Sequence, residues 1–235
     1  MPLPDSQDSS LWTYIRTSRG PERPPNRGSP PPWTGASRGN ILGVRVRVAT
    51  ERDLDSLTGM FTAAYAAVPL WSWAFPEQEG LAAWWRFLIR SALRYPWVWI
   101  AEDCAAASVW IPPGGDELTE EEEASIEPLL DEILGPRRPV VMELLRRFEN
   151  AHPQELPHYS RRSLGTDPAH RGKGLGLALL ADNLARIDAE GAPAYLESSD
   201  PANTRRYERL GFVRIGEFMS SHEQETISTM WREAH

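Results

Sequence analysis

The hydrophobic positions of this chain change their period several times, and each change marks an expected strand or helix. Residues 44–48, "VRVRV", alternate with the period of two that is typical of a strand. Further strands are predicted at about 97–102, 106–111, 157–166, 194–198, 212–219 and 226–232. Helices are predicted at about 50–67, 77–95, 120–134, 140–150, 174–190 and 203–210.

Local signals support several of these boundaries. Thr50 with Asp53, and Thr119 with Glu122, have the spacing of a capping box at a helix start. Pro76 stands at the start of the second helix, and the strands at 97–102 and 106–111 form a hairpin around residues 103–105. The acidic run at 120–123 is interpreted as the solvated first turn of its helix.

The order of these elements predicts the fold class. Strands and helices alternate, with antiparallel hairpins near both ends, which indicates a mixed α/β fold. We expect one domain at 44–235, with a central twisted sheet of about six to seven strands flanked by helices. Residues 1–43 hold eight prolines and no apolar period, so they are predicted to be a disordered tail. Alternatively, this segment is present because the start codon has been assigned too far upstream.

Composition narrows the class of protein. The 235 residues carry a net charge of −8, and five Arg against three acids in residues 1–43 leave about −10 on residues 44–235. An acidic domain argues against a nucleic-acid partner and is compatible with a cationic amine. Cys104 is the only cysteine, which excludes an internal disulfide and a cysteine-based metal cluster. With no apolar run long enough to cross a bilayer and no signal-peptide pattern, we expect a cytoplasmic monomer or homodimer without a membrane partner or a metal.

The segment "GTDPAHRGKGLGLALL" at 165–180 is the strongest chemical signal. It fails the dinucleotide pattern G-x-G-x-x-G, because Leu177 and Leu179 stand where the third glycine is needed. It also fails the P-loop pattern, since Gly174 follows Lys173 where Ser or Thr is required. What remains is R-x-x-G-x-G, a loop whose backbone N–H groups and following helix can bind an anion. A plain surface turn is the alternative interpretation of the same residues.

The wider context resembles a known family. "LGTDPAHRGKGLGLALL" after a strand, followed by "AYLESSDPANTRRYERLGF", resembles the GNAT superfamily of N-acetyltransferases over about residues 44–235. Within it, "VWIAED", "SVWIPPGG", the helical insert and "PAYLESS" resemble the puromycin N-acetyltransferase type of actinomycetes. The resemblance implies the GNAT fold and acetyl-CoA as co-substrate.

The resemblance also implies roles for particular positions. The end of the glycine strand would pair with the pantetheine arm of the coenzyme, and one of its N–H groups would polarise the thioester: Leu164, Gly165 and Thr166. The loop and first helical turn would hold the pyrophosphate: Arg171, Gly172, Lys173, Gly174, Leu175, Gly176 and Leu177. Asn203 would bind the pantetheine. Tyr207, in "RRYERLGF", would be the general acid at the sulfur, although a core aromatic is the alternative.

The general base is left open among three residues. Glu197 stands between apolar neighbours in "YLESS", where a charge needs a reason, and it is the first candidate; a structural ion pair would also explain it. His158 is the rival base because an unperturbed histidine titrates near neutral pH, and Glu155 is a third candidate. Direct attack in a ternary complex needs no covalent intermediate, and Cys104 is not expected to act as a nucleophile.

Two features concern the acceptor. In "VPLWSWAF", Trp71, Trp73 and Phe75 alternate as if lining one surface, so they are predicted to bind the substrate, with core packing as the alternative. The cluster of Trp84, Trp85, Phe87 and Leu88 is interpreted as core. Arg161 and Arg162 should point to opposite faces of the glycine strand, so one of them must meet the core or the cleft and needs a partner.

Taken together, the sequence predicts an acetyl-CoA-dependent N-acetyltransferase that modifies the primary amine of a small molecule, in a setting such as antibiotic resistance. Acetylation of a protein or peptide N-terminus is one alternative. A non-catalytic acyl-CoA-binding regulatory module is the other, and it would have no need of Tyr207.

Overall fold

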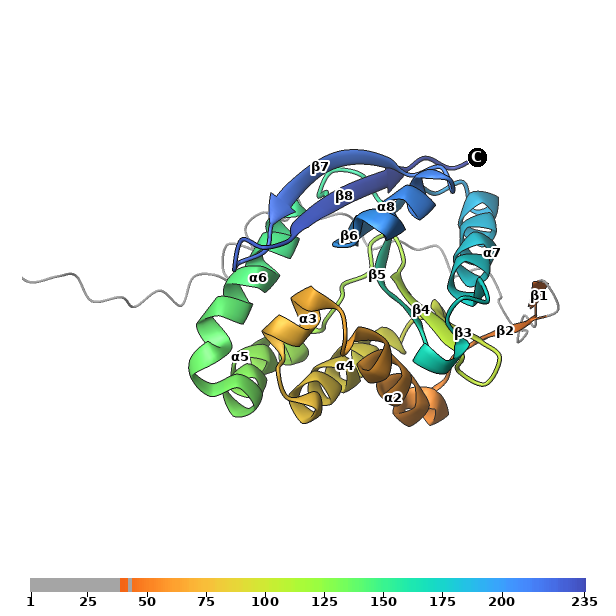
Figure 1. The fold of residues 1–235 in the computed structure, drawn as a ribbon. Coiled ribbons are helices and arrows are strands. Elements are labelled where there is room, and N and C mark those ends of the chain that lie inside the picture. Colours follow the sequence, from red (N-terminus) through yellow and green to blue (C-terminus); the bar gives the residue numbers. More distant parts are fainter. Residues whose placement is uncertain (1–38, 42–43) are drawn as a thin grey trace, which may run out of the picture. The chain divides into compact units, whose positions relative to one another are not determined.

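The described part of the chain is built on one continuous sheet. A computed structural model describes residues 39–41 and 44–235, which belong to one compact unit, residues 36–235. Their sheet has eight strands in the order β1-β2-β3-β4-β5-β6-β8-β7, shown in Figure 1. The strands are β1 (Gly39–Ile41), β2 (Val44–Val48), β3 (Val98–Ala101), β4 (Ala106–Ile111), β5 (Tyr159–Thr166), β6 (Ala194–Ser198), β7 (Val213–Met219) and β8 (Thr226–Arg232).

The mixed α/β fold class predicted from the sequence is confirmed. The seven predicted strands are present, and short β1 adds an eighth that pairs with β2. β1 lies within the stretch that was predicted to be a disordered tail. The rest of that stretch lies outside the described residues, and so does the position of the start codon that the sequence analysis questioned.

The helices follow the predicted order with one addition. They are α2 (Leu54–Tyr65), α3 (Pro69–Ala74), α4 (Gln78–Ala92), α5 (Glu120–Leu134), α6 (Arg138–Ala151), α7 (Leu175–Ala189) and α8 (Pro201–Glu208), with short 3₁₀ turns at Glu51–Asp53, Gly135–Arg137 and Pro168–His170. Both capping boxes are formed, at Thr50 and at Thr119. Helix α3 was not predicted, because its six residues alternate like a short strand.

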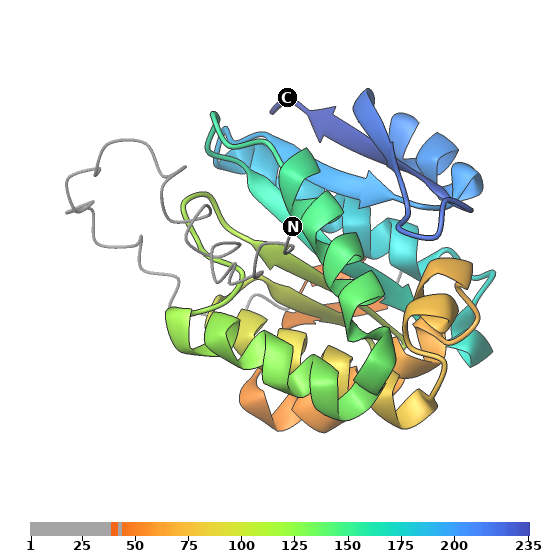
Figure 2. The ribbon, with the colours of Figure 1, turned by 90° about the vertical axis from the view of Figure 1, so that its left-hand side faces the viewer.

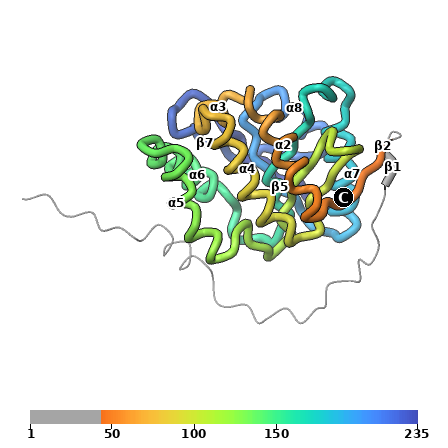
Figure 3. The backbone as a smooth tube through the Cα atoms, turned by 90° about the horizontal axis from the view of Figure 1, so that it is seen from below, coloured from red at the N-terminus to blue at the C-terminus, as the bar shows by residue number. Residues whose placement is uncertain are grey.

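Helices cover both faces of the sheet. Helices α2 and α4 pack together on one face, against β5 and β4, and α7 packs against β3, β4 and β5 on the other (Figure 1). Viewed from below, α2 and α4 lie side by side in front of the strands (Figure 3). Helices α5 and α6 continue the α4 layer, and α6 reaches β7 (Figure 2).

The α7 face holds the main core. Leu179, Leu180, Leu184 and Ile187 of α7 pack in one buried cluster with aromatic and aliphatic side chains of the strands. Apolar residues every three to four positions give α7 this single buried stripe. The N-terminus of α7, and the loop before it, are thereby held rigidly at the end of β5.

The feature that matters most for function is a divergence of two strands. β5 and β6 are the only parallel neighbours in this sheet, and they pair only over residues 159–161 of β5. Beyond Arg161, β5 continues to Thr166 while remaining paired with β4 alone. The register shift between Val109 and Trp110 leaves Arg162 as an extra residue on β5, a β-bulge that bends the strand. The edge of β5 from 162 to 166 is therefore open toward β6.

Candidate active site

The open edge of β5 presents backbone groups that no strand uses. The amide N–H of Leu164 and its carbonyl oxygen both meet the Tyr65 hydroxyl, at 3.3 Å and 3.2 Å. Both groups of one strand residue point to the same side, so they lie on the side of β5 that faces away from β4. Leu164 thus offers one donor and one acceptor to an extended ligand laid along this edge.

Tyr65 was missed by the sequence analysis. It is the last residue of α2, and no motif marks it. Burial raises the pKa of its hydroxyl, while the nearby Arg161 charge acts in the opposite direction. The protonated phenol can therefore both donate to and accept from Leu164.

The glycine loop forms the far end of the opening. Gly172 and Gly174 have φ of +80° and +76°, and Gly174 is the N-cap of α7. A Cβ at either position would meet nothing within 4 Å, so the space above the loop is open. Gly176 is different, because a Cβ there would lie 2.7 Å from Oγ1 of Thr166. The helix start therefore packs directly on the end of β5.

This loop has the donors that an anion needs. The first-turn amides of α7 have no intrahelical acceptor, and the helix dipole favours a negative charge at this end. Lys173 is exposed beside them. Arg171 is partly committed, since its Nη2 donates to the Ala64 carbonyl at the end of α2, at 2.7 Å. Of the predicted anion-binding residues, 171–177, Gly172 and Gly174 border open space, whereas Leu175 packs in the core.

Two predicted residues come from α8, which begins directly after β6. Asn203 is half-buried, and its Oδ1 accepts a hydrogen bond from Arg206 at 2.6 Å. Tyr207 is buried, and its hydroxyl oxygen accepts from Nη1 of Arg161 at 2.8 Å. The guanidinium carbon of Arg161 also lies 4.6 Å from the centre of the Tyr207 ring.

The two adjacent arginines, Arg161 and Arg162, have different hydrogen-bond partners. Arg161 lies on the α8 face, where Nη2 donates to the Glu197 carbonyl at 3.0 Å. Arg162 lies on the α4 face, where Nε donates to Glu117 at 2.8 Å. Only Arg162 has the carboxylate partner that the sequence analysis called for.

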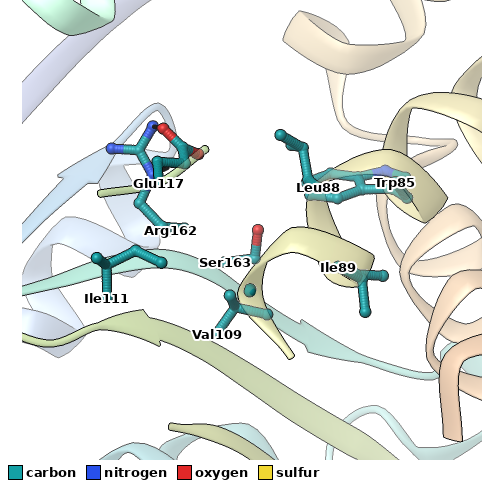
Figure 4. Close-up of a pocket in the computed structure, with 9 residues that line it drawn as sticks. Trp85, Leu88, Ile89, Val109, Ile111, Glu117, Arg162 and Ser163 are labelled. Carbon is teal, nitrogen blue, oxygen red and sulfur yellow. Dashed lines mark hydrogen bonds and ion pairs between the residues drawn. The ribbon is translucent and has the colours of Figure 1, made fainter. Parts of the chain in front are cut away.

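Arg162 and Glu117 form one wall of a cavity between α4 and the sheet. Figure 4 shows their charged groups side by side, with Ser163 nearby and Leu88 across the space. The cavity is small and partly open to solvent, and it is lined by Trp85, Leu88, Ile89, Ala92, Val109, Ile111, Glu117, Arg162 and Ser163. Of the four residues interpreted as core, Trp84 and Trp85 are buried, whereas Phe87 and Leu88 are only partly buried. Trp85 and Leu88 line this cavity.

Glu197 lies at the end of β6 with an unsatisfied carboxylate oxygen. Its side chain is 9% exposed, and Oε1 is 4.0 Å from Nδ1 of His152 on α6. Neither atom has a hydrogen-bond partner among the described residues. Burial raises the pKa of Glu197, but His152 and the Arg162 charge outweigh it, so the pKa lies below its usual value. Glu197 is therefore a buried carboxylate that is charged at neutral pH.

His158, the rival base, has both ring nitrogens engaged. Nδ1 lies 2.6 Å from the Leu156 carbonyl, so it carries the hydrogen. Burial lowers the pKa of His158, so the ring is neutral and Nε2 accepts from His152 Nε2 at 3.2 Å. Glu155 is exposed to solvent. Of the three candidate bases, Glu197 is the buried carboxylate with an unpaired oxygen.

The predicted aromatic surface at 71–75 needs a correction. Because α3 is a helix, Trp71 and Trp73 do not share a face. Trp71 packs on Tyr65 and Trp85, whereas Trp73 stacks on His222 of the β7–β8 loop, with ring centres 3.9 Å apart. Phe75 is 2% exposed and lies in the core.

Cys104 occupies the β3–β4 turn with φ of +69°. Burial raises the pKa of its thiol to about 11. The thiol is therefore protonated at neutral pH and a poor nucleophile. Among residues 39–41 and 44–235, no three His, Cys, Asp or Glu side chains are grouped to hold a metal ion. None of the helices described is long and apolar enough to cross a membrane.

Comparison with known proteins identifies the class that this fold and opening define. The model of the acetyltransferase (GNAT) family matches residues 64–212, so the chain belongs to that family. A histone acetyltransferase HPA2 and related acetyltransferase from Corynebacterium glutamicum is 22% identical, with a TM-score of 0.61, covering 81% of this chain and 96% of that one.

Two further solved structures are similar. An agmatine N-acetyltransferase is 20% identical, with a TM-score of 0.61, covering 81% of this chain and 99% of its own. A polyamine N-acetyltransferase of Drosophila melanogaster, which forms N-acetylagmatine, is 22% identical, with a TM-score of 0.58 and coverages of 81% and 99%. At these identities the likeness establishes the fold.

Proposed function

We propose that this protein transfers the acetyl group of acetyl-CoA to the primary amine of a small molecule, by direct attack within a ternary complex. The observation that carries the proposal is the opening between β5 and β6. It has backbone groups at Leu164 that no strand uses and open space above the glycine loop at one end, with Tyr207 on α8 and Glu197 on β6.

The coenzyme would occupy this opening as substrate. Its pyrophosphate would lie over residues 171–177, where main-chain N–H groups and Lys173 supply donors. Its pantetheine amides would pair with the edge of Leu164, Gly165 and Thr166, as a strand would, with Asn203 on the opposite side. The thioester oxygen would compete with the Tyr65 hydroxyl for the Leu164 N–H, and that hydrogen bond would polarise the carbonyl.

Residues of the chain supply the proton transfers. The amine must lose a proton, and the leaving sulfur must gain one. Glu197 is charged and has a free oxygen, so it can bind an ammonium group and accept its proton through water. Tyr207 would donate its hydroxyl proton to the sulfur. Holding two substrates in line supplies much of the remaining rate enhancement.

The acceptor is proposed to be a small amine. The cavity beside Arg162 is narrow and mostly apolar, and the stacked pair of Trp73 and His222 joins α3 to the β7–β8 loop. These features favour an enclosed site over the open groove that a protein N-terminus needs. Some of the similar structures are named for acetylating agmatine or a polyamine. The narrower setting, modification of a puromycin-like antibiotic in an actinomycete cytoplasm, rests on the sequence resemblance alone.

The test is thiol release from acetyl-CoA across a panel of amines. The panel contains aminonucleosides, aminoglycosides, agmatine, polyamines and peptide N-termini, with Gly174→Glu as the blank. We expect turnover of at least one small amine, which is lost in the blank. Turnover of peptides alone would favour an N-terminal acetyltransferase. Coenzyme binding with no turnover would favour a regulatory module.

Glu197→Gln is expected to lower kcat/KM for the amine at least about tenfold, because it removes the charged acceptor of the ammonium proton while keeping the side-chain shape. Since the pKa of Glu197 is below its usual value, the carboxylate is ionised throughout, and the loss should be similar from about pH 6 to about pH 8. The exposed Glu155→Gln serves as the control and should match the wild type. Equal activity of both variants would exclude Glu197 as the base.

A further inference from the structure

Arg161 is a buried cation without a counter-charge. It is 6% exposed, and its two hydrogen-bond acceptors are a phenol oxygen and a main-chain carbonyl. Its Nε has no partner, and none of the ion pairs among the described residues includes it. Burying an unpaired charge is costly. Other buried arginines of this chain have counter-charges. Arg162 pairs with Glu117, and Arg232, which is as buried as Arg161, donates to both carboxylate oxygens of Asp188, at 2.6 and 2.8 Å.

The position of Arg161 points to a reason other than stability. It is the last residue of β5 that pairs with β6, opposite Leu196, so it lies where the two strands diverge. One arm holds the Glu197 carbonyl on β6, and the other holds the Tyr207 hydroxyl on α8. The Tyr65 hydroxyl lies further along β5, against the backbone of Leu164. Arg161 and Tyr207 therefore lie together at the closed end of the opening.

The hydrogen bond to Tyr207 has only one direction. A guanidinium has five donors and no acceptor, so the Tyr207 oxygen must accept from Arg161. The hydroxyl hydrogen of Tyr207 is then directed away from the guanidinium. Among residues 39–41 and 44–235, the Tyr207 hydroxyl donates its hydrogen to no other group. Arg161 thereby orients the Tyr207 hydroxyl as a proton donor.

We infer that Arg161 is a positioning residue for acetyl transfer, which holds Tyr207 in its donor orientation and offsets the negative charge that develops on the coenzyme sulfur. The inference rests on the proposed function. In the step, the amine nitrogen bonds to the carbonyl carbon, the carbon–sulfur bond breaks, and its electron pair goes to sulfur. The sulfur takes the Tyr207 proton, and Tyr207 regains a proton released by the amine through solvent. Arg161 keeps its protons and its charge throughout.

The first test compares stability with activity in Arg161→Met and Arg232→Met. Removing one partner of a buried ion pair leaves an uncompensated charge and is strongly destabilising, whereas Arg161→Met leaves no charge behind. We expect Arg161→Met to lower the melting temperature less than Arg232→Met does. With a small amine identified by the panel, Arg161→Met should lower kcat at least about tenfold. Arg161→Lys, which keeps the charge, should recover part of that loss.

The second test needs no turnover. The thiol of bound coenzyme A is titrated through the ultraviolet absorption of its thiolate, in complexes with the wild type and with Arg161→Met. A cation within about 4–6 Å lowers an acid's pKa by one unit or more, so the bound thiol should titrate at least about one pH unit lower in the wild type. The other titratable groups at this opening are Tyr65 from α2, Tyr207 from α8 and Glu197 from β6, and all three are unchanged in the variant.

The outcomes distinguish a failure of this inference from a failure of the proposed function. A wild type that binds no coenzyme A overturns the proposed function, and the role of Arg161 with it. Coenzyme A that binds both proteins with the same thiol pKa overturns the role of Arg161 alone. A melting temperature that falls in Arg161→Met as it does in Arg232→Met, with unchanged kcat, would make Arg161 a structural residue.

Discussion

Gly174→Glu is expected to lower the affinity for acetyl-CoA at least about a hundredfold, or about 2.8 kcal/mol. Gly174 has φ of +76°, caps α7, and has open space where a Cβ would stand. A side chain there would fill the space that the pyrophosphate needs, and its carboxylate would repel the phosphates. The carboxylate would also accept hydrogen bonds from the N-terminal amides of the helix, which the pyrophosphate would otherwise receive. Titration calorimetry with acetyl-CoA measures the change.

The matched control is Gly191→Glu, just beyond the other end of α7. Gly191 also has a positive φ, +65°, and open space around a Cβ. Both substitutions place an L side chain in the left-handed region, at a cost of roughly 1–2 kcal/mol in stability. We expect similar losses of stability and a coenzyme affinity that changes only in Gly174→Glu. Equal affinities in the two variants would show that the loop does not hold the coenzyme.

Tyr207→Phe is expected to lower kcat about a hundredfold while leaving the Kd for acetyl-CoA within about threefold. The change removes the hydroxyl that is proposed to protonate the sulfur and keeps the ring that packs in the core. Steady-state kinetics with the amine found in the panel gives kcat, and calorimetry gives Kd. Because Arg161 loses an acceptor in this variant, a stability loss of about 1–3 kcal/mol accompanies the change.

Tyr159→Phe controls for the loss of a buried hydroxyl as such. Tyr159 is 2% exposed, lies on the same strand as Arg161, and donates to Glu190 at the C-terminus of α7. It should lose stability and keep kcat. If Tyr207→Phe retains the wild-type kcat, the protonation of sulfur must come from another group, and the inference about Arg161 loses its mechanism.

Local patterns in the sequence predicted most elements. Strand β6 was predicted at its observed bounds, and both capping boxes were predicted from spacing. Such features depend on residues a few positions apart, so the chain displays them directly. Helix α3 was not predicted, because a five-residue alternation of aromatic residues occurs both in short strands and in short helices. For that reason Trp73 was wrongly assigned to one surface with Trp71 and Phe75, which do stack on each other.

The sequence by itself determined the fold class and the family, and it predicted the anion-binding loop, because R-x-x-G-x-G brings its donors together within six residues. Only the tertiary structure decided what surrounds the proposed reacting groups. Tyr65 meets Leu164 from 99 positions away, and Arg161 meets Tyr207 across 46. The opening itself exists because β5 bulges at Arg162 and leaves β6 after three paired residues. These contacts depend on how strands diverge and helices pack, and no spacing along the chain encodes them.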